Sequence, residues 1–259
     1  FDEIWIIDHS TTTAEASGSG GDLLFRWGNP IAYDKGSVED QKLFGQHNAH
    51  WIEPGLPEAG KVVVFNNGVN RPDGVYSSVI KLDLNDDASY PKDEWGQFLP
   101  NDMFWEFTAS PNTSFYSRFI SGAHQLPNGN TLITDGAHGT FFEINTNKEE
   151  VWRYVSPVTI FGIAEQGNLV TNPVGDGTNT VFRATKYPIN HPAFLGRNLI
   201  PGAPIENNPD LTPCEMAIDN PPDETTSITV LMFPNPANDH VNITGFQGAY
   251  NIFNVHGKN

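Results

Sequence analysis

The sequence predicts an all-β protein, and three observations favour this fold class. Short apolar runs rich in Val, Ile, Phe and Trp recur along the chain and are separated by turn residues. The 259 residues include 24 Gly and 20 Pro, which suits many tight turns, and 12% of the residues are aromatic. The same order of four short runs also occurs twice, which is typical of a repeat architecture.

The first two expected strands are Phe1–Asp8 and Asp22–Trp27. The apolar run Ile4–Ile7 marks the first, and Gly28-Asn29-Pro30 closes the second with turn residues. Between them, Ser10–Gly21 is rich in Ser, Thr and Gly, so we expect a loop there.

A histidine-containing segment, Gly45–Ile52, opens the next group of strands. The β-branched run Val62–Phe65 follows and leads to Asn67-Gly68, a turn signal that tolerates positive φ. Two further strands are expected over Ser77–Asp83 and Met103–Phe107.

Four strands in the same order are expected again after residue 120. They cover Ser121–Leu126, Asn130–Thr134, Thr140–Asn145 and Glu150–Tyr154. In this repeat His50 aligns with His124, and Trp105 aligns with Trp152, 47 positions later. That spacing is typical of propeller blades, which take roughly 40–50 residues. Aromatic residues two apart share a strand face and would wedge one blade against the next, so the repeat predicts a β-propeller of four-stranded blades.

The composition changes near residue 205, which divides the chain into three parts. Residues 1–205 hold the expected propeller strands. Residues 206–226 are rich in Pro, Asn and acidic residues and have little to bury, so they read as a linker. Residues 227–259 contain the run Ile228–Phe233 and further short apolar runs, which predict the beginning of a small β-sandwich. Because Phe1 stands inside an expected strand, we expect a fragment of a longer protein.

Charge and composition exclude several classes of protein. The formal net charge of −17 argues against nucleic acid as a partner, because phosphate binding needs a basic face. No segment reaches the roughly 20 apolar residues that span a bilayer. Cys214 is the only cysteine, so no internal disulfide forms. No Gly-rich phosphate loop with a lysine occurs, so a nucleotide cofactor is not expected, nor is any other cofactor.

The candidate site is a group of histidine, asparagine and arginine side chains on neighbouring strand ends, a combination that could hold a small oxyanion. Its centre is His47, with Asn67 and Arg71 at the turn that follows the next strand. The further candidates for contacts with an anionic substrate are His50, His124 and Arg183.

The further candidates each have a structural alternative. We favour Arg183 because a cation inside the apolar run Val181–Thr185 usually has an assigned partner, although that partner could be a buried carboxylate. His50 and His124 share a repeat register, which also fits a role in building the blades. The pair His47-x-x-His50 also resembles a metal site. Residues three apart on a regular strand face opposite sides, however, and no Cys or acidic ligand is close, so no metal is expected.

The motifs in residues 1–206 resemble those of the aryl-sulfate sulfotransferases. The matching segments are Gln46-His47-Asn48-Ala49, Phe65-Asn66-Asn67-Gly68 with Arg71, Tyr76–Val79 and Phe115–Ser117. The resemblance implies a six-bladed propeller that moves a sulfuryl group from an aryl sulfate to a phenol without a nucleotide donor. It also implies that the histidine matching His47 becomes transiently sulfurylated.

Two departures from that family stand out. Asn48 occupies a position where the family usually has Thr. By alignment, the family's His-x-Asn motif and its sulfate-binding arginine fall before Phe1, so part of the expected site is missing from this chain.

The tail, Val230–Lys258, resembles the start of a type A sorting domain of the type IX secretion system, through Pro234-Asn235-Pro236-Ala237 and the later Gly257-Lys258. The resemblance implies that this machinery is a partner and that the protein is secreted or held at the cell surface.

Three functions remain open from the sequence. The first is an aryl-sulfate sulfotransferase. The second is a non-catalytic secreted β-propeller that serves as a binding or scaffold module at the cell surface. The third is a sulfate-ester hydrolase that uses the same site with water as the acceptor.

Overall fold

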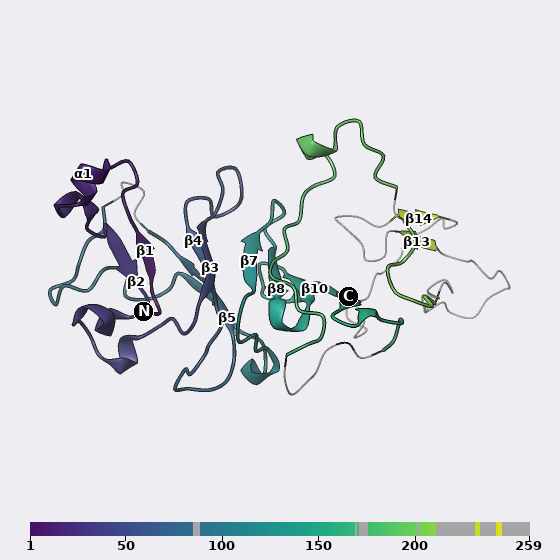
Figure 1. Cartoon of the computed structure of the whole chain (residues 1–259), viewed down its shortest axis with the longest axis horizontal. Helices are drawn as coiled ribbons and strands as arrows, with labels where there is room; N and C mark the ends of the chain where they lie inside the picture. The colour runs from purple at the N-terminus through teal and green to yellow at the C-terminus, as the bar shows by residue number, and fades with distance from the viewer. Residues whose placement is uncertain are drawn as a thin grey trace.

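A computed structural model describes residues 1–84, 89–168, 170, 176–200 and 202–210, and the backbone of 231–233 and 242–244 (Figure 1). Its strands are β1 (Ile4–Ile6), β2 (Phe25–Trp27), β3 (His47–Trp51), β4 (Val62–Asn66), β5 (Ser78–Leu82), β6 (Trp105–Phe107), β7 (Gly122–Gln125), β8 (Thr131–Asp135), β9 (Thr140–Ile144), β10 (Glu150–Val155), β11 (Val158–Thr159), β12 (Gly162–Ile163), β13 (Leu231–Phe233) and β14 (Asn242–Thr244). Helical structure within the described residues is short and comprises α1 (Thr13–Ala16) and the 3₁₀ turns η1 (Ser19–Gly21), η2 (Pro30–Tyr33), η3 (Val38–Asp40), η4 (Asn112–Ser114), η5 (Gly136–His138) and η6 (Pro192–Phe194).

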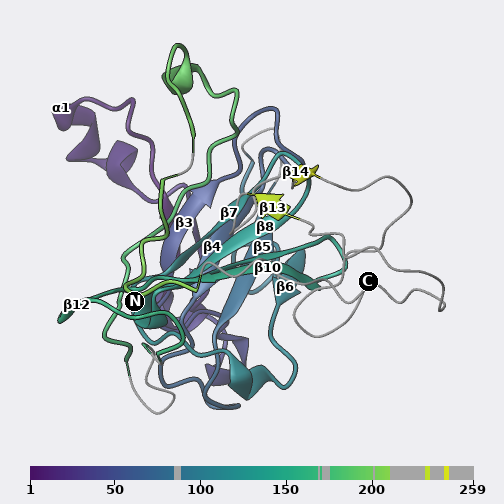
Figure 2. The same cartoon turned by 90° about the vertical axis from the view of Figure 1, so that its right-hand side faces the viewer.

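Three layers of strands stand side by side in Figure 1, and Figure 2 views them one behind another. The first is the hairpin β1–β2, the second is the antiparallel sheet β3-β4-β5-β6, and the third is the antiparallel sheet β7-β8-β9-β10. The predicted recurrence of four consecutive strands is confirmed, because both larger sheets run in sequence order. Within the described residues no sheet closes, so the all-β class is established and the propeller remains a prediction.

The middle sheet is buried on both faces because it lies between the other two layers. In β4, Val62 and Val64 face the hairpin β1–β2, whereas Val63 and Phe65 face the third layer. The first of the two cores also contains Ile4, Phe25, Trp27, Leu43, Ile80, Leu82, Leu84 and Phe98. The second also contains Ile52, Val79, Phe107, Phe115, Ala123, Ile133, Phe142 and Ile144.

The aromatic-x-aromatic strands pack largely as expected. Phe25 and Trp27 are both buried in the first core, and Arg26 between them points away from it. In β10, the rings of Trp152 and Tyr154 stack with centroids 6.4 Å apart. These pairs therefore share a strand face, as their spacing predicts.

The expected loop over residues 10–21 contains the short helix α1. The Thr12 hydroxyl accepts a hydrogen bond from the Glu15 backbone N–H, and the Glu15 carboxylate accepts one from the Thr12 backbone N–H at 2.8 Å. This reciprocal capping box satisfies donors at the start of the helix, which a reading of the composition alone did not anticipate.

The C-terminal part of the chain is described only in places. Most of the expected linker, residues 211–226, lies outside the described residues, as does most of the expected sandwich. There β13 pairs with β14 in antiparallel register, within two of the apolar runs that the sequence marks. Among the described residues, no helix is both long and apolar enough to cross a bilayer.

Candidate functional site

The strand β3 is irregular at its histidines. His47 pairs with Phe65 and His50 pairs with Val63, so three steps along β3 match two steps along β4. This is a β-bulge, and Asn48 within it has a φ of 56°, in the left-handed region. Because directly paired residues project from the same face of an antiparallel sheet, His47 and His50 share the face that looks toward the third layer. The expectation that they face opposite ways assumed a regular strand and is wrong.

The ring of His47 is half-buried and held through one nitrogen. Its Nδ1 lies 2.8 Å from Asn67 Oδ1 and 3.1 Å from the carbonyl oxygen of Gly45. No hydrogen bond joins Nε2 to any residue in the described part of the chain. The ring is therefore anchored on one side and has a free nitrogen on the other.

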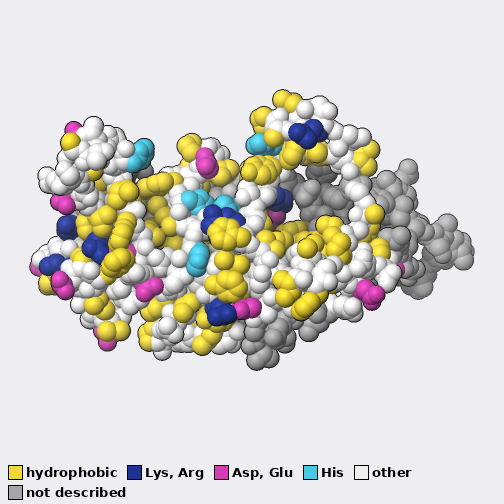
Figure 3. Space-filling model, in the orientation of Figure 1, with side chains coloured by type: hydrophobic (Ala, Val, Ile, Leu, Met, Phe, Trp, Pro, Cys, Tyr) yellow, Lys and Arg dark blue, Asp and Glu magenta, His cyan; other side chains and the backbone are white. Residues whose placement is uncertain are grey.

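The second layer meets the third at His50 and His124. Their ring centroids are 4.8 Å apart, so the two histidines that align in the sequence repeat are in contact. The approach depends on Gly122 in β7, because a Cβ atom there would lie 2.2 Å from Asn48 Oδ1. Figure 3 shows histidine side chains gathered beside Lys or Arg side chains in the middle of this face of the molecule.

The electrostatics of this contact keep His124 uncharged at neutral pH. Burial of the ring, together with the neighbouring His50 and the positive charge of Arg183, lowers the pKa of His124 from 6.5 to about 4, and burial is the largest of these causes. The Nε2 atom of His124 is buried and has no hydrogen-bond partner among the described residues. We refer to Asn48, His50, His124 and Arg183 as the inter-sheet cluster.

Arg183 acts on His124 through its charge and belongs to an irregular segment. The residues around it form no strand, and the neighbouring Phe182 is 63% exposed, so the predicted setting of a cation inside an apolar strand is wrong. The segment is fixed beside η5 by a 2.9 Å hydrogen bond from the Val181 N–H to the Gly136 carbonyl oxygen. Among the described residues Arg183 pairs with no carboxylate, so its charge is available to the inter-sheet cluster.

Arg71 is engaged elsewhere. Its Nε donates to Asp73 Oδ1 at 2.8 Å, and its guanidinium carbon lies 3.7 Å from the centre of the Tyr76 ring. Burial and a hydrogen bond to Asp73 raise the pKa of Tyr76 to about 12, so Tyr76 stays a neutral platform. None of these contacts joins Arg71 to His47, although the sequence analysis grouped the two residues.

Asn67 lies beneath His47 and is fully buried. Its side chain therefore has no exposed surface to offer a substrate, although the sequence analysis listed it among the substrate contacts. In contrast, the rings of His50 and His124 are in contact, and Arg183 is near enough for its charge to lower the pKa of His124.

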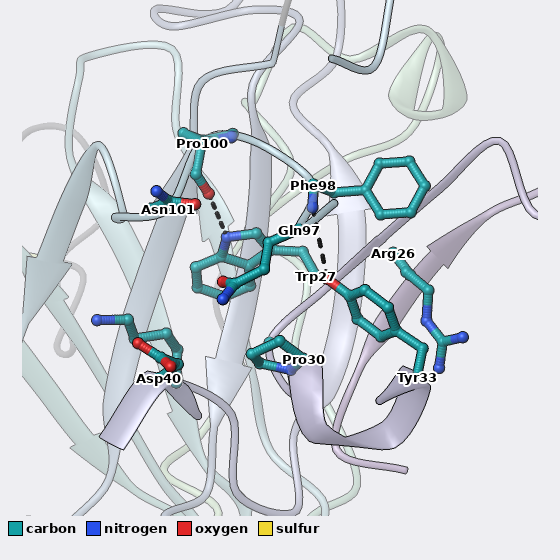
Figure 4. A pocket seen from close by; sticks show the side chains of 11 residues that line it. Arg26, Trp27, Pro30, Tyr33, Asp40, Gln97, Phe98, Pro100 and Asn101 are labelled. Carbon is teal, nitrogen blue, oxygen red and sulfur yellow. Dashed lines mark hydrogen bonds between the residues drawn. The ribbon is translucent and has the colours of Figure 1, made fainter. Parts of the chain in front are cut away.

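Two cavities in the described part of the chain lie in and beside the first core. One of about 20 Å³ is lined by Trp27, Tyr33 and Phe98, among others, and has room for one water molecule (Figure 4). A second, of about 200 Å³, lies between Leu84 and Pro100. Neither includes a residue of the inter-sheet cluster.

The bulge and the glycine opposite it were not anticipated from the sequence. The only local signal was Asn48 itself, since Asn adopts the left-handed conformation more readily than most residues. In the described part of the chain, no group of three or more His, Cys, Asp and Glu side chains could hold a metal ion.

Comparison with protein-family models, curated proteins and solved structures found no match to this chain. The function is therefore inferred from the chemistry of His47 and the inter-sheet cluster and from the motifs in the sequence.

Proposed function

We propose that this chain is part of a secreted aryl-sulfate sulfotransferase in which His47 is the nucleophile. The observation that carries the proposal is the His47 ring itself, which is anchored through Nδ1 and has an unengaged Nε2. The resemblance of its flanking motif to that of the sulfotransferases supplies the reaction class.

In the first step, the lone pair of His47 Nε2 attacks the sulfur atom of an aryl sulfate. The N–S bond forms as the bond between sulfur and the aryl oxygen breaks, and the phenolate leaves with that electron pair. The ring then carries a positive charge and the attached sulfonate a negative one. In the second step, a phenol oxygen attacks the same sulfur, the N–S bond breaks, and the phenol proton passes to solvent.

The inter-sheet cluster would stabilise the sulfuryl oxygens during both steps. Arg183 supplies a full positive charge, and the uncharged ring of His124 would supply an N–H donor. A single well-placed donor of this kind is worth about 3–4 kcal/mol in a transition state. The bulge favours this arrangement because it turns His50 to the same face as His47, about 7 Å further along the strand.

The location and partners are also part of the proposal. The resemblance of residues 230–258 to a sorting domain supports export by the type IX secretion machinery, to the cell surface or the medium. The small-molecule partners would be an aryl sulfate as donor and a phenol as acceptor.

The test incubates the full-length protein with a chromogenic aryl sulfate, with and without a phenol. We expect ping-pong kinetics and a mass increase of one sulfuryl group on the peptide that contains His47. His47→Ala should abolish both, whereas His9→Ala, at an exposed histidine in the first loop, should change neither. Unchanged release of the chromophore by His47→Ala would refute the assignment.

A non-catalytic binding module is the second candidate, and the engagement of Arg71 by Asp73 favours it because this removes one expected cation from the site. Saturable binding of a sulfated ligand without any labelled histidine would support it. Chromophore release that does not respond to added phenol would instead indicate a hydrolase.

A further inference from the structure

We infer that Asn67 is a positioning residue that holds His47 in the tautomer protonated on Nδ1, and so presents Nε2 as the nucleophilic nitrogen. The sequence had suggested that Asn67 contacts the substrate. The catalytic meaning of the inference rests on the proposed function, but the tautomer itself does not.

The orientation of the Asn67 amide follows from its other hydrogen bonds. The Nδ2 group donates to the carbonyl oxygens of Ser117, at 2.7 Å, and of Ile120, at 3.0 Å. A carbonyl oxygen can only accept, so the NH₂ group must face these two atoms. The amide oxygen is thereby turned toward His47.

The tautomer of His47 follows in the same way. Its Nδ1 lies between two oxygens that can only accept, Asn67 Oδ1 at 2.8 Å and the Gly45 carbonyl at 3.1 Å. Nδ1 must therefore carry the proton, and the lone pair of the neutral ring resides on Nε2. When Nε2 takes up a sulfuryl group, the ring becomes cationic, and the hydrogen bond to Asn67 becomes charge-assisted.

A buried network holds Asn67 rigid. The Ser77 hydroxyl donates to the backbone carbonyl oxygen of Asn67 at 2.8 Å and accepts from the Ser117 backbone N–H at 2.9 Å. The Ser117 hydroxyl in turn lies 2.8 Å from that of Ser121, whose hydroxyl accepts from the Gly136 N–H at 3.0 Å. The second and third layers are thus joined through the residue that anchors His47, which suits a positioning role.

The experiment measures the tautomer directly, by side-chain ¹⁵N NMR of the labelled full-length protein at about pH 8, where a free histidine is neutral. In the wild type we expect a protonated Nδ1 and an unprotonated Nε2 for His47. Asn67→Leu removes the acceptor and should give a mixture of both tautomers. Asn67→Asp keeps an acceptor oxygen and should retain the wild-type tautomer.

This pair of variants separates positioning from a merely structural role. Asn67→Asp loses the donors to Ser117 and Ile120 just as Asn67→Leu does, so a structural role predicts equal damage. We expect kcat to fall about a hundredfold in Asn67→Leu but less than about tenfold in Asn67→Asp, with KM little changed in both. The matched control is Asn66→Leu, since Asn66 is equally buried but bonds to Lys42 and Phe44 instead.

Two results would overturn the inference. One is a folded wild type whose His47 carries its proton on Nε2, a measurement that needs no variant to fold. The other is an unchanged tautomer in Asn67→Leu, which would mean that the Gly45 carbonyl suffices. If the tautomer behaves as expected but no sulfohistidine forms, the proposed function fails and the inference stands. If sulfohistidine forms although the free His47 ring is protonated at Nε2, the inference fails and the proposed function stands.

Discussion

Replacing Gly122 with alanine tests whether the bulge in β3 depends on its close contact with β7. Gly122 is the first residue of β7 and does not have a positive φ, so alanine fits its backbone. The added Cβ would lie 2.2 Å from Asn48 Oδ1, 2.9 Å from its Cγ and 3.2 Å from its Cβ. The whole Asn48 side chain must therefore retreat by about 1 Å, and the bulge that orients His47 and His50 must shift with it.

Overpacking of this kind typically costs 1–3 kcal/mol, and we expect about 2 kcal/mol here because two layers meet at the contact. In urea, with an m-value of about 2 kcal/mol/M, the unfolding midpoint should fall by about 1 M. Tryptophan fluorescence reports the transition. Gly18→Ala is the matched control, because its Cβ would meet only the Glu15 carbonyl oxygen, at 3.7 Å, and its midpoint should not move.

A double-mutant cycle identifies the clashing partner. Asn48→Gly removes the side chain that obstructs the new Cβ, and glycine adopts the positive φ without strain. In the Asn48→Gly background, Gly122→Ala should cost less than about 1 kcal/mol. The difference between its costs in the two backgrounds is the coupling energy, which is small for distant residues. Equal costs of Gly122→Ala in the two backgrounds would refute the proposed contact.

Two further predictions concern charge. The pKa of His124 is about 4 in the folded protein and near 6.5 when unfolded, so the unfolded state binds more protons between these values. Its contribution to stability should be complete above pH 6.5 and decline as the pH falls toward 4, and His124→Gln should flatten this part of the stability–pH curve. A slope that is the same in both proteins would contradict the shifted pKa. The second prediction concerns Lys81, whose side chain is 4% exposed and pairs with Glu58 and, at 2.7 Å, with Gln125 Oε1. Glu58→Gln should cost about 2 kcal/mol in urea unfolding because it leaves a buried cation unpaired, whereas Lys81→Met should cost less. If Lys81→Met cost more than Glu58→Gln, an unpaired buried cation would not explain the loss of stability.

The strands were predictable because their signals are local. Short apolar runs and turn residues such as Asn67-Gly68 stand within a few positions of one another, and β3 through β10 lie within a residue or two of the expected runs. The repeat register was informative too, since His50 and His124 meet across the two sheets. The capping box of α1 was overlooked although its residues were visible.

The candidate site was predictable only as a set of residues. That Arg71 is engaged by Asp73 could not be inferred from spacing, because it depends on how a turn folds back onto Tyr76. Arg183 was favoured because a strand was expected around it, and that strand does not form. Its charge nevertheless acts on His124, because the segment that carries it packs near a residue far away in the sequence.

The order and identity of the strands were thus set by short-range pattern in the sequence alone, because each strand needs only its own apolar run and the turns that flank it. The sheet face from which His47 projects and the burial of Asn67 were decided by the tertiary structure. A bulge is a property of two paired strands, and a hydrogen-bond direction depends on every acceptor around an amide, so neither exists until residues far apart in the chain have packed together.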